Sequence, residues 1–170
     1  MVRKNHMDSL ILLSGRLSHG VLRLASICLA SLGLVVIYGV VMRYGFNDAP
    51  PFVEQVALLL VICVAMFGAA SGVHDAGHIG LDSAVKLLPA KAQFWCTVIV
   101  DLLTLLFATV LVWGSVQMGL STRHDSIPTL GISEAFRYLP PVIAGLLIIL
   151  FAFEHLLLLF IKKPSASSWN

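Results

Sequence analysis

Four long apolar segments, each bounded by charged or turn-forming residues, make up most of this 170-residue chain. A helix needs about 20 mainly apolar residues to cross a bilayer, and each segment reaches that length. The pattern therefore predicts an all-α membrane protein with four transmembrane helices, organised as one membrane domain over residues 1–170. The predicted spans are residues 21–44, 52–73, 93–122 and 140–161.

Two shorter segments have an amphipathic pattern. Residues 7–20 place three leucines on one helical face opposite polar residues, which predicts an N-terminal arm at the membrane surface, either separate from the first span or continuous with it. Residues 79–88 carry Asp82 and Lys86 four positions apart, away from an apolar face. This segment is too short to cross the bilayer, so it is predicted to be an interfacial helix. The serine-rich residues 164–170 are predicted to be a disordered tail.

The composition excludes most soluble functions. Hydrophobic residues make up 58% of the chain and charged residues 12%, with a mean hydropathy of +0.93, whereas soluble domains carry about 25% charged residues. A net charge of +2 is too small to favour a nucleic-acid partner. The three cysteines fall in or beside apolar segments without a CxxC spacing, and we interpret them as small buried hydrophobic residues: Cys28, Cys63 and Cys96.

Positive charges predict the orientation in the membrane. Four spans place both termini on one side, and lysines and arginines gather at the termini and in the loop around residues 86–91. The positive-inside rule assigns that side to the cytoplasm. The loops around Asn47 and Pro128 then face outward. The basic N-terminus followed by an apolar segment is interpreted as an uncleaved first span rather than a signal peptide.

The second span carries the clearest signals of a helix start and of a helix contact. Pro50 and Pro51 precede it, where a missing N–H costs nothing, and Glu54 in its first turn complements the helix dipole. Gly68 and Gly72 form a GxxxG pair, whose small residues let another helix approach closely. Packing within this chain and packing against another subunit are both open.

Ionisable residues inside the spans require an explanation. Asp101 on the third span and Glu154 and His155 on the fourth are predicted to lie at a similar depth near the cytoplasmic side, and Arg23 enters the first span near that level. One interpretation is a buried polar cluster that fixes helix register. The other is a proton or cation path in an independent small transporter that uses Asp101 and Glu154. The apolar centre of every span favours the first interpretation, because a path has to cross the membrane.

Histidines on the same side provide a further alternative. His74 and His78 are one helical turn apart, and His155 lies on the fourth span. Histidine holds haem iron in many proteins, so a haem-bearing membrane anchor of a respiratory enzyme is an alternative function. The competing interpretation is capping and hydrogen bonding at the interface. No Ser-His-Asp set, P-loop or HExxH motif occurs, so the sequence predicts no enzyme, no metal site and no catalytic residue.

A series of short motifs gives a more specific indication. Their order and spacing resemble the small permease subunit of tripartite ATP-independent periplasmic (TRAP) transporters, over nearly the whole chain after Val21. The motifs are Val41-Met42-Arg43-Tyr44, Pro51 with Glu54, Gly68-Ala69-Ala70, Gly77-His78-Ile79-Gly80-Leu81-Asp82, Leu87-Leu88-Pro89, and Ser126, Pro128, Leu130, Gly131 and Ile132 before the prolines of the fourth span. The family often has two acids where this chain has Glu54 and Gln55. It also often has a basic residue before the Gly/His stretch, where this chain has His74, Asp75 and Ala76.

The resemblance implies a scaffold function in the bacterial inner membrane. A large permease subunit would hold the substrate and sodium sites and move as an elevator. A periplasmic binding protein would deliver an organic acid of the C4-dicarboxylate or sialic acid class. This chain would then need no cofactor and no substrate-binding residue, and its partners would be those two proteins and membrane phospholipids. The positions expected to be architectural or to contact the partner are Arg43, Glu54, Gly68, Gly72, His78 and Asp82.

Overall fold

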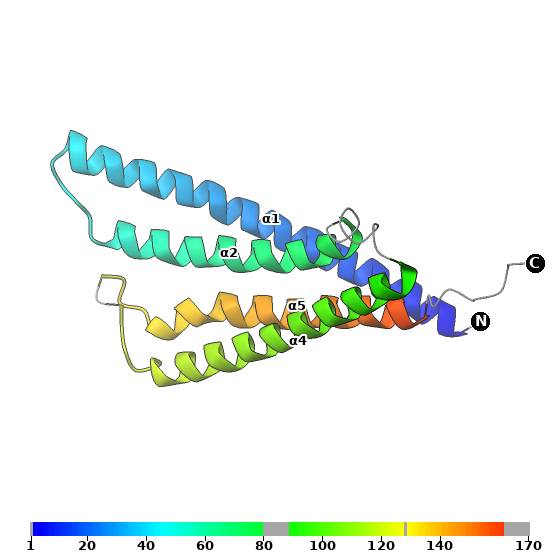
Figure 1. The fold of residues 1–170 in the computed structure, drawn as a ribbon. Helices are drawn as coiled ribbons and strands as arrows, with labels where there is room; N and C mark the ends of the chain where they lie inside the picture. The colour runs from blue at the N-terminus through cyan, green and yellow to red at the C-terminus, as the bar shows by residue number, and fades with distance from the viewer. Residues whose placement is uncertain (1, 80–88, 128, 162–170) are drawn as a thin grey trace, which may run out of the picture.

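The computed structural model describes residues 2–79, 89–127 and 129–161 of the chain. Four of the described helices are long and apolar enough to cross a membrane, which confirms the predicted all-α fold with four spans. In chain order the elements are α1 (Val2–Gly45), α2 (Phe52–Ile79), α4 (Ala90–Ser121), the 3₁₀ helix η1 (Glu134–Tyr138) and α5 (Leu139–Ile161) (Figure 1).

At the start of the chain the structure has one of the two expected arrangements, in which the N-terminal segment is continuous with the first span. The segment predicted as an amphipathic arm, residues 7–20, belongs to α1, which continues without a break to Gly45. The physical reason is that no proline interrupts the chain before Pro50, and isolated glycines at positions 15 and 20 cost a helix only about 1 kcal/mol each. Its position at a membrane surface stays a prediction. The predicted interfacial helix over residues 79–88 and the predicted tail over residues 164–170 lie outside the described residues, apart from Ile79 at the end of α2.

Turn chemistry places the other helix ends close to the predicted positions. α2 begins directly after Pro51, with Glu54 in its first turn. Ser133 caps η1, because its hydroxyl oxygen accepts a hydrogen bond from the Ala135 N–H. Pro140 and Pro141 lie in the first turn of α5, where a missing N–H breaks no helical hydrogen bond.

The helices form an open row rather than a closed bundle. α1 packs against α2, α2 against α5, and α5 against α4, so each outer helix has one main neighbour. Figure 1 shows the α1–α2 hairpin and the α4–α5 hairpin converging toward the end where α1 begins and α5 ends. Small side chains dominate the buried cluster between the hairpins, which consists of Ala25, Phe67, Ala70, Ala108, Ala144 and Ile148. Such residues let helix backbones approach closely in a membrane.

Two glycines set the distances within the hairpins. A Cβ atom on Gly39 would lie 2.7 Å from Val53 Cγ1, across the α1–α2 contact. A Cβ atom on Gly145 would lie 2.5 Å from Val112 Cγ2 and 3.5 Å from the Ala108 carbonyl oxygen, across the α4–α5 contact. A side chain at either position would force the facing valine, or the helix that carries it, to shift.

Gly145→Leu is therefore expected to destabilise the protein. Overpacking a tight contact costs about 1–3 kcal/mol, and a Cβ atom at this position would lie only 2.5 Å from Val112 Cγ2, so the valine or its helix has to shift. The thermal unfolding midpoint of the purified protein in detergent measures this effect. Gly114→Leu is the matched control, since a Cβ atom on Gly114 meets nothing within 4 Å. Equal midpoints for the two variants would contradict the assigned contact.

Candidate functional site

A carboxylate and an imidazole meet between α4 and α5. Asp101 is only 7% exposed, and His155 Nδ1 lies 2.9 Å from its Oδ1 and 2.8 Å from its Oδ2. The nitrogen that faces the carboxylate therefore carries the hydrogen and donates it. A buried carboxylate is costly unless it accepts hydrogen bonds, and this contact supplies one between α4 and α5.

Hydroxyl contacts join the remaining helices at the same end of the row. The Ser14 hydroxyl on α1 donates to Glu154 Oε1 on α5 over 2.9 Å. The hydroxyls of Ser18 on α1 and Ser71 on α2 lie 3.2 Å apart and are buried. We define the polar layer by six residues: Ser14, Ser18, Ser71, Asp101, Glu154 and His155. It links each helix of the row to another near the end where α1 begins and α5 ends.

The polar layer contains only part of the predicted buried cluster. Asp101, Glu154 and His155 belong to it, but they form two separate contacts rather than one. Arg23 is exposed on α1 and makes no ion pair with the described carboxylates. The inward face of α1 passes through Ser18 and Ala25, and the helical period of 3.6 residues then turns Arg23 outward.

The histidines of the haem hypothesis have protein partners where they are described. The His74 ring packs edge-on against Phe151, with ring centroids 5.0 Å apart, and its Nδ1 lies 3.3 Å from Asp75 Oδ1. His78 lies in the last turn of α2, and Asp82 lies outside the described residues. Among the described residues, no three histidine, cysteine or acidic side chains gather in a way that would hold a metal ion.

The opposite end of the row also carries polar contacts. Arg43 Nη2, at the end of α1, lies 4.0 Å from Glu54 Oε1 at the start of α2, and both side chains are exposed. Arg137 donates from Nη1 to Glu134 Oε1 over 3.0 Å and from Nη2 to Gln55 Oε1 over 3.2 Å. The contact between Arg137 and Gln55 fastens η1 to α2.

Sequence reasoning missed the role of Arg137. Its spacing of three residues from Glu134 is a recognisable signal for a local ion pair. The contact with Gln55 follows only from the fold, because the two residues are 82 positions apart in the chain.

The GxxxG pair on α2 has open space beside it in the part of the chain that the structure describes. A Cβ atom on Gly68 or on Gly72 would meet nothing within 4 Å. Ala65 and Ala69, on the same side of α2, are exposed. We call these four residues the small-residue face of α2. Of the two packing alternatives, the structure does not use this face within the part of the chain that it describes.

The Asp101–His155 contact is expected to show energetic coupling. A hydrogen bond to a charged group contributes about 1.5–3 kcal/mol, and its two partners should not behave independently. A double-mutant cycle with Asp101→Asn and His155→Gln, followed by thermal unfolding in detergent, measures the coupling. Thr104→Val is the control, because that hydroxyl bonds only to its own helix, at the Val100 carbonyl oxygen. Additive effects of the two substitutions would contradict the coupling.

Comparison with known proteins identifies the family. Residues 32–162 match the family described as tripartite ATP-independent periplasmic transporters, DctQ component. Two proteins of Haemophilus influenzae, both assigned as TRAP transporter small permease proteins, are also similar. One is 30% identical over 121 residues, covering 71% of this chain and 74% of the relative. The other is 24% identical over 111 residues, covering 65% and 67%. The chain therefore belongs to the DctQ family and is a TRAP transporter small permease subunit, a multi-pass protein of the inner membrane.

Proposed function

We propose that this subunit is a fixed membrane scaffold that braces the large permease subunit of its transporter. Family membership implies association with that subunit and with a periplasmic binding protein. The haem-anchor and independent-transporter alternatives are not favoured by this membership. The scaffold function assigns transport to the partner and support to this chain.

The observation that carries the proposal is the small-residue face of α2. α2 lies inside the row, between α1 and α5, yet Gly68 and Gly72 leave space for a further helix. Small residues at this spacing typically allow close contact between transmembrane helices. A helix of the large permease is the partner that we assign to this face.

The other interface positions fit a supporting function. Arg43 and Glu54 connect α1 to α2, and we assign them an architectural function. His78 and Asp82 follow the small-residue face along the chain, and we assign them to the interface near the cytoplasmic side. The orientation with both termini in the cytoplasm follows from the positive-inside rule.

A fixed scaffold also makes physical sense beside a moving domain. Four membrane spans resist displacement along the membrane normal, because apolar area moved into water costs about 25 cal/mol per Å². The outward loop carries Arg123 and Asp125, both exposed, and charges of both signs suit a salt-sensitive docking of the binding protein. Membrane phospholipids would cover the apolar faces that the large permease leaves open.

We assign sodium-coupled uptake of an organic acid, of the C4-dicarboxylate or sialic acid class, to the assembled transporter. The substrate site lies on the large permease, so this chain alone should not transport. Proteoliposomes that contain the small subunit alone, the two permease subunits, or both with the binding protein test this. Sodium-driven uptake of labelled acid is expected only when the large permease is present. Uptake by the small subunit alone would refute the scaffold function.

Gly68→Leu is expected to weaken co-purification with the large permease. A Cβ atom at Gly68 meets nothing within 4 Å in the described part of the chain, so loss of the complex from a variant with an unchanged thermal unfolding midpoint would arise at the interface. Recovery of the large subunit with an affinity-tagged small subunit measures the effect, and we expect a loss of roughly tenfold or more, equivalent to about 1.4 kcal/mol.

Gly33→Leu and Gly114→Leu are the matched controls for this prediction. Both glycines also have nothing within 4 Å of a built Cβ atom, but they lie on α1 and α4, beside large exposed side chains such as Leu34 and Trp113. Recovery of the complex should be normal for these two variants. Undiminished recovery for Gly68→Leu would remove the small-residue face from the interface.

A further inference from the structure

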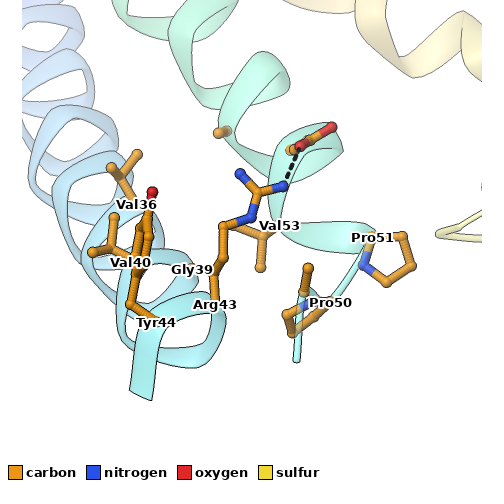
Figure 2. Close-up of a pocket in the computed structure, with 11 residues that line it drawn as sticks. Val36, Gly39, Val40, Arg43, Tyr44, Pro50, Pro51 and Val53 are labelled. Carbon is orange, nitrogen blue, oxygen red and sulfur yellow. Dashed lines mark ion pairs between the residues drawn. The ribbon is translucent and has the colours of Figure 1, made fainter. Parts of the chain in front are cut away.

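An open pocket lies between α1 and α2 at the end of the row opposite the polar layer (Figure 2). Its volume is about 490 Å³, within the roughly 300–1,000 Å³ of typical ligand pockets. Its apolar wall includes Val36, Val40 and Ala57, and it lies over the close contact between Gly39 and Val53. The neighbouring turn between the helices contributes two prolines. The pocket is therefore built by the α1–α2 hairpin alone.

Two opposite charges stand at the rim of the pocket. Arg43 reaches from α1 toward α2, where the dashed line in Figure 2 marks its ion pair with Glu54. The pair is loose, since the atoms are 4.0 Å apart and the side chains are 60% and 78% exposed. Both groups therefore keep hydrogen-bonding capacity for a ligand. Tyr44, also on the rim, is 82% exposed, as is common for tyrosine at a membrane interface.

The charges and the apolar wall follow one another along the helix axis. At 1.5 Å per residue, Val40 and Val36 lie about 4.5 and 10 Å deeper in the membrane than Arg43. Val36 and Val40 are 46% and 51% exposed, so the wall is open to the hydrocarbon region. The charged rim lies at headgroup depth and the apolar wall lies below it, so the two match the polar headgroup and the acyl chains of a phospholipid.

We propose that this pocket binds a zwitterionic phospholipid with a primary amine, of the phosphatidylethanolamine type. The phosphate would contact the Arg43 guanidinium, the ammonium group would contact the Glu54 carboxylate, and one acyl chain would lie along Val36 and Val40. With the termini in the cytoplasm, the lipid belongs to the outer leaflet. The inference rests on the membrane spans and on the pocket, and it does not require the scaffold function.

The pairing of charges selects the headgroup. Charge-assisted hydrogen bonds are the strong ones, and a primary ammonium donates them while a choline group does not. An anionic headgroup without an amine would bring its phosphate to Arg43 but would leave Glu54 beside a second negative group. The rim therefore favours phosphatidylethanolamine over phosphatidylglycerol and over phosphatidylcholine.

Native mass spectrometry of the delipidated full-length chain, titrated in detergent with each of these three lipids, tests the proposal. Arg43→Gln should weaken phosphatidylethanolamine binding roughly three- to tenfold, as expected for the loss of a hydrogen bond to a charged group. Glu54→Gln should abolish the preference for phosphatidylethanolamine over phosphatidylglycerol. Circular dichroism and the thermal unfolding midpoint establish that both variants are folded.

Arg16→Gln is the matched control, because Arg16 is an exposed arginine at the other end of α1. An equal loss of lipid in Arg16→Gln, or no loss in Arg43→Gln, would overturn the proposal. The same titration on the complex with the large permease provides a second arm. Lipid binding that depends on Arg43 in the isolated chain but disappears in the complex would show that a protein segment fills the pocket, which also overturns it. If no complex forms, the proposed scaffold function fails while the isolated chain still decides the lipid site.

Discussion

Apolar side chains gain little by leaving lipid tails for one another, so helices in a membrane associate through close packing and a few hydrogen bonds. This constraint explains where the present chain is tight and where it is open. Gly39 and Gly145 bring the helices of each hairpin together. Buried alanines fill the contact between the two hairpins. The Asp101–His155 contact and the serine contacts then fix the register at one end. Elsewhere the spans expose large apolar side chains that suit lipid.

The two ends of the row are held in different ways, and the difference places the candidate sites. At the end where α1 begins, the polar layer is partly or fully buried and joins all four helices. At the other end, Arg43 and Glu54 form a loose, exposed pair, while Arg137 fastens η1 to α2 through Gln55. At the first end, the polar side chains therefore find their hydrogen-bond partners within the chain itself. The second end keeps charged groups that a ligand can reach, directly above an apolar wall.

Hydropathy and turn chemistry were sufficient for the fold but not for the neighbours of each helix. The spans follow from long apolar segments, and the start of α2 follows from Pro50 and Pro51. The predicted depth of Asp101 and His155 in the membrane was enough to place them together, because α4 and α5 form a hairpin and cross the same level. Depth alone could not exclude Arg23 from the predicted buried cluster, since it does not determine which face of α1 points inward. Nor could it find the contact of Arg137 with Gln55, which depends on α2 lying beside α5.

The glycines of α2 differ from the other glycines of the described helices in what lies beside them. A glycine in a helix costs about 0.5–1 kcal/mol relative to alanine, and for Gly39 and Gly145 the close helix contacts offset that cost within the chain. Gly68 and Gly72 have no such contact. Gly33 and Gly114 are also open, but each stands among large exposed side chains, so neither forms a flat surface. Among the described helices, only α2 has two such glycines one turn apart beside exposed alanines, and it lies inside the row. In the scaffold that we propose, contact with a helix of the large permease offsets their cost, and the helices around α2 hold that surface in place.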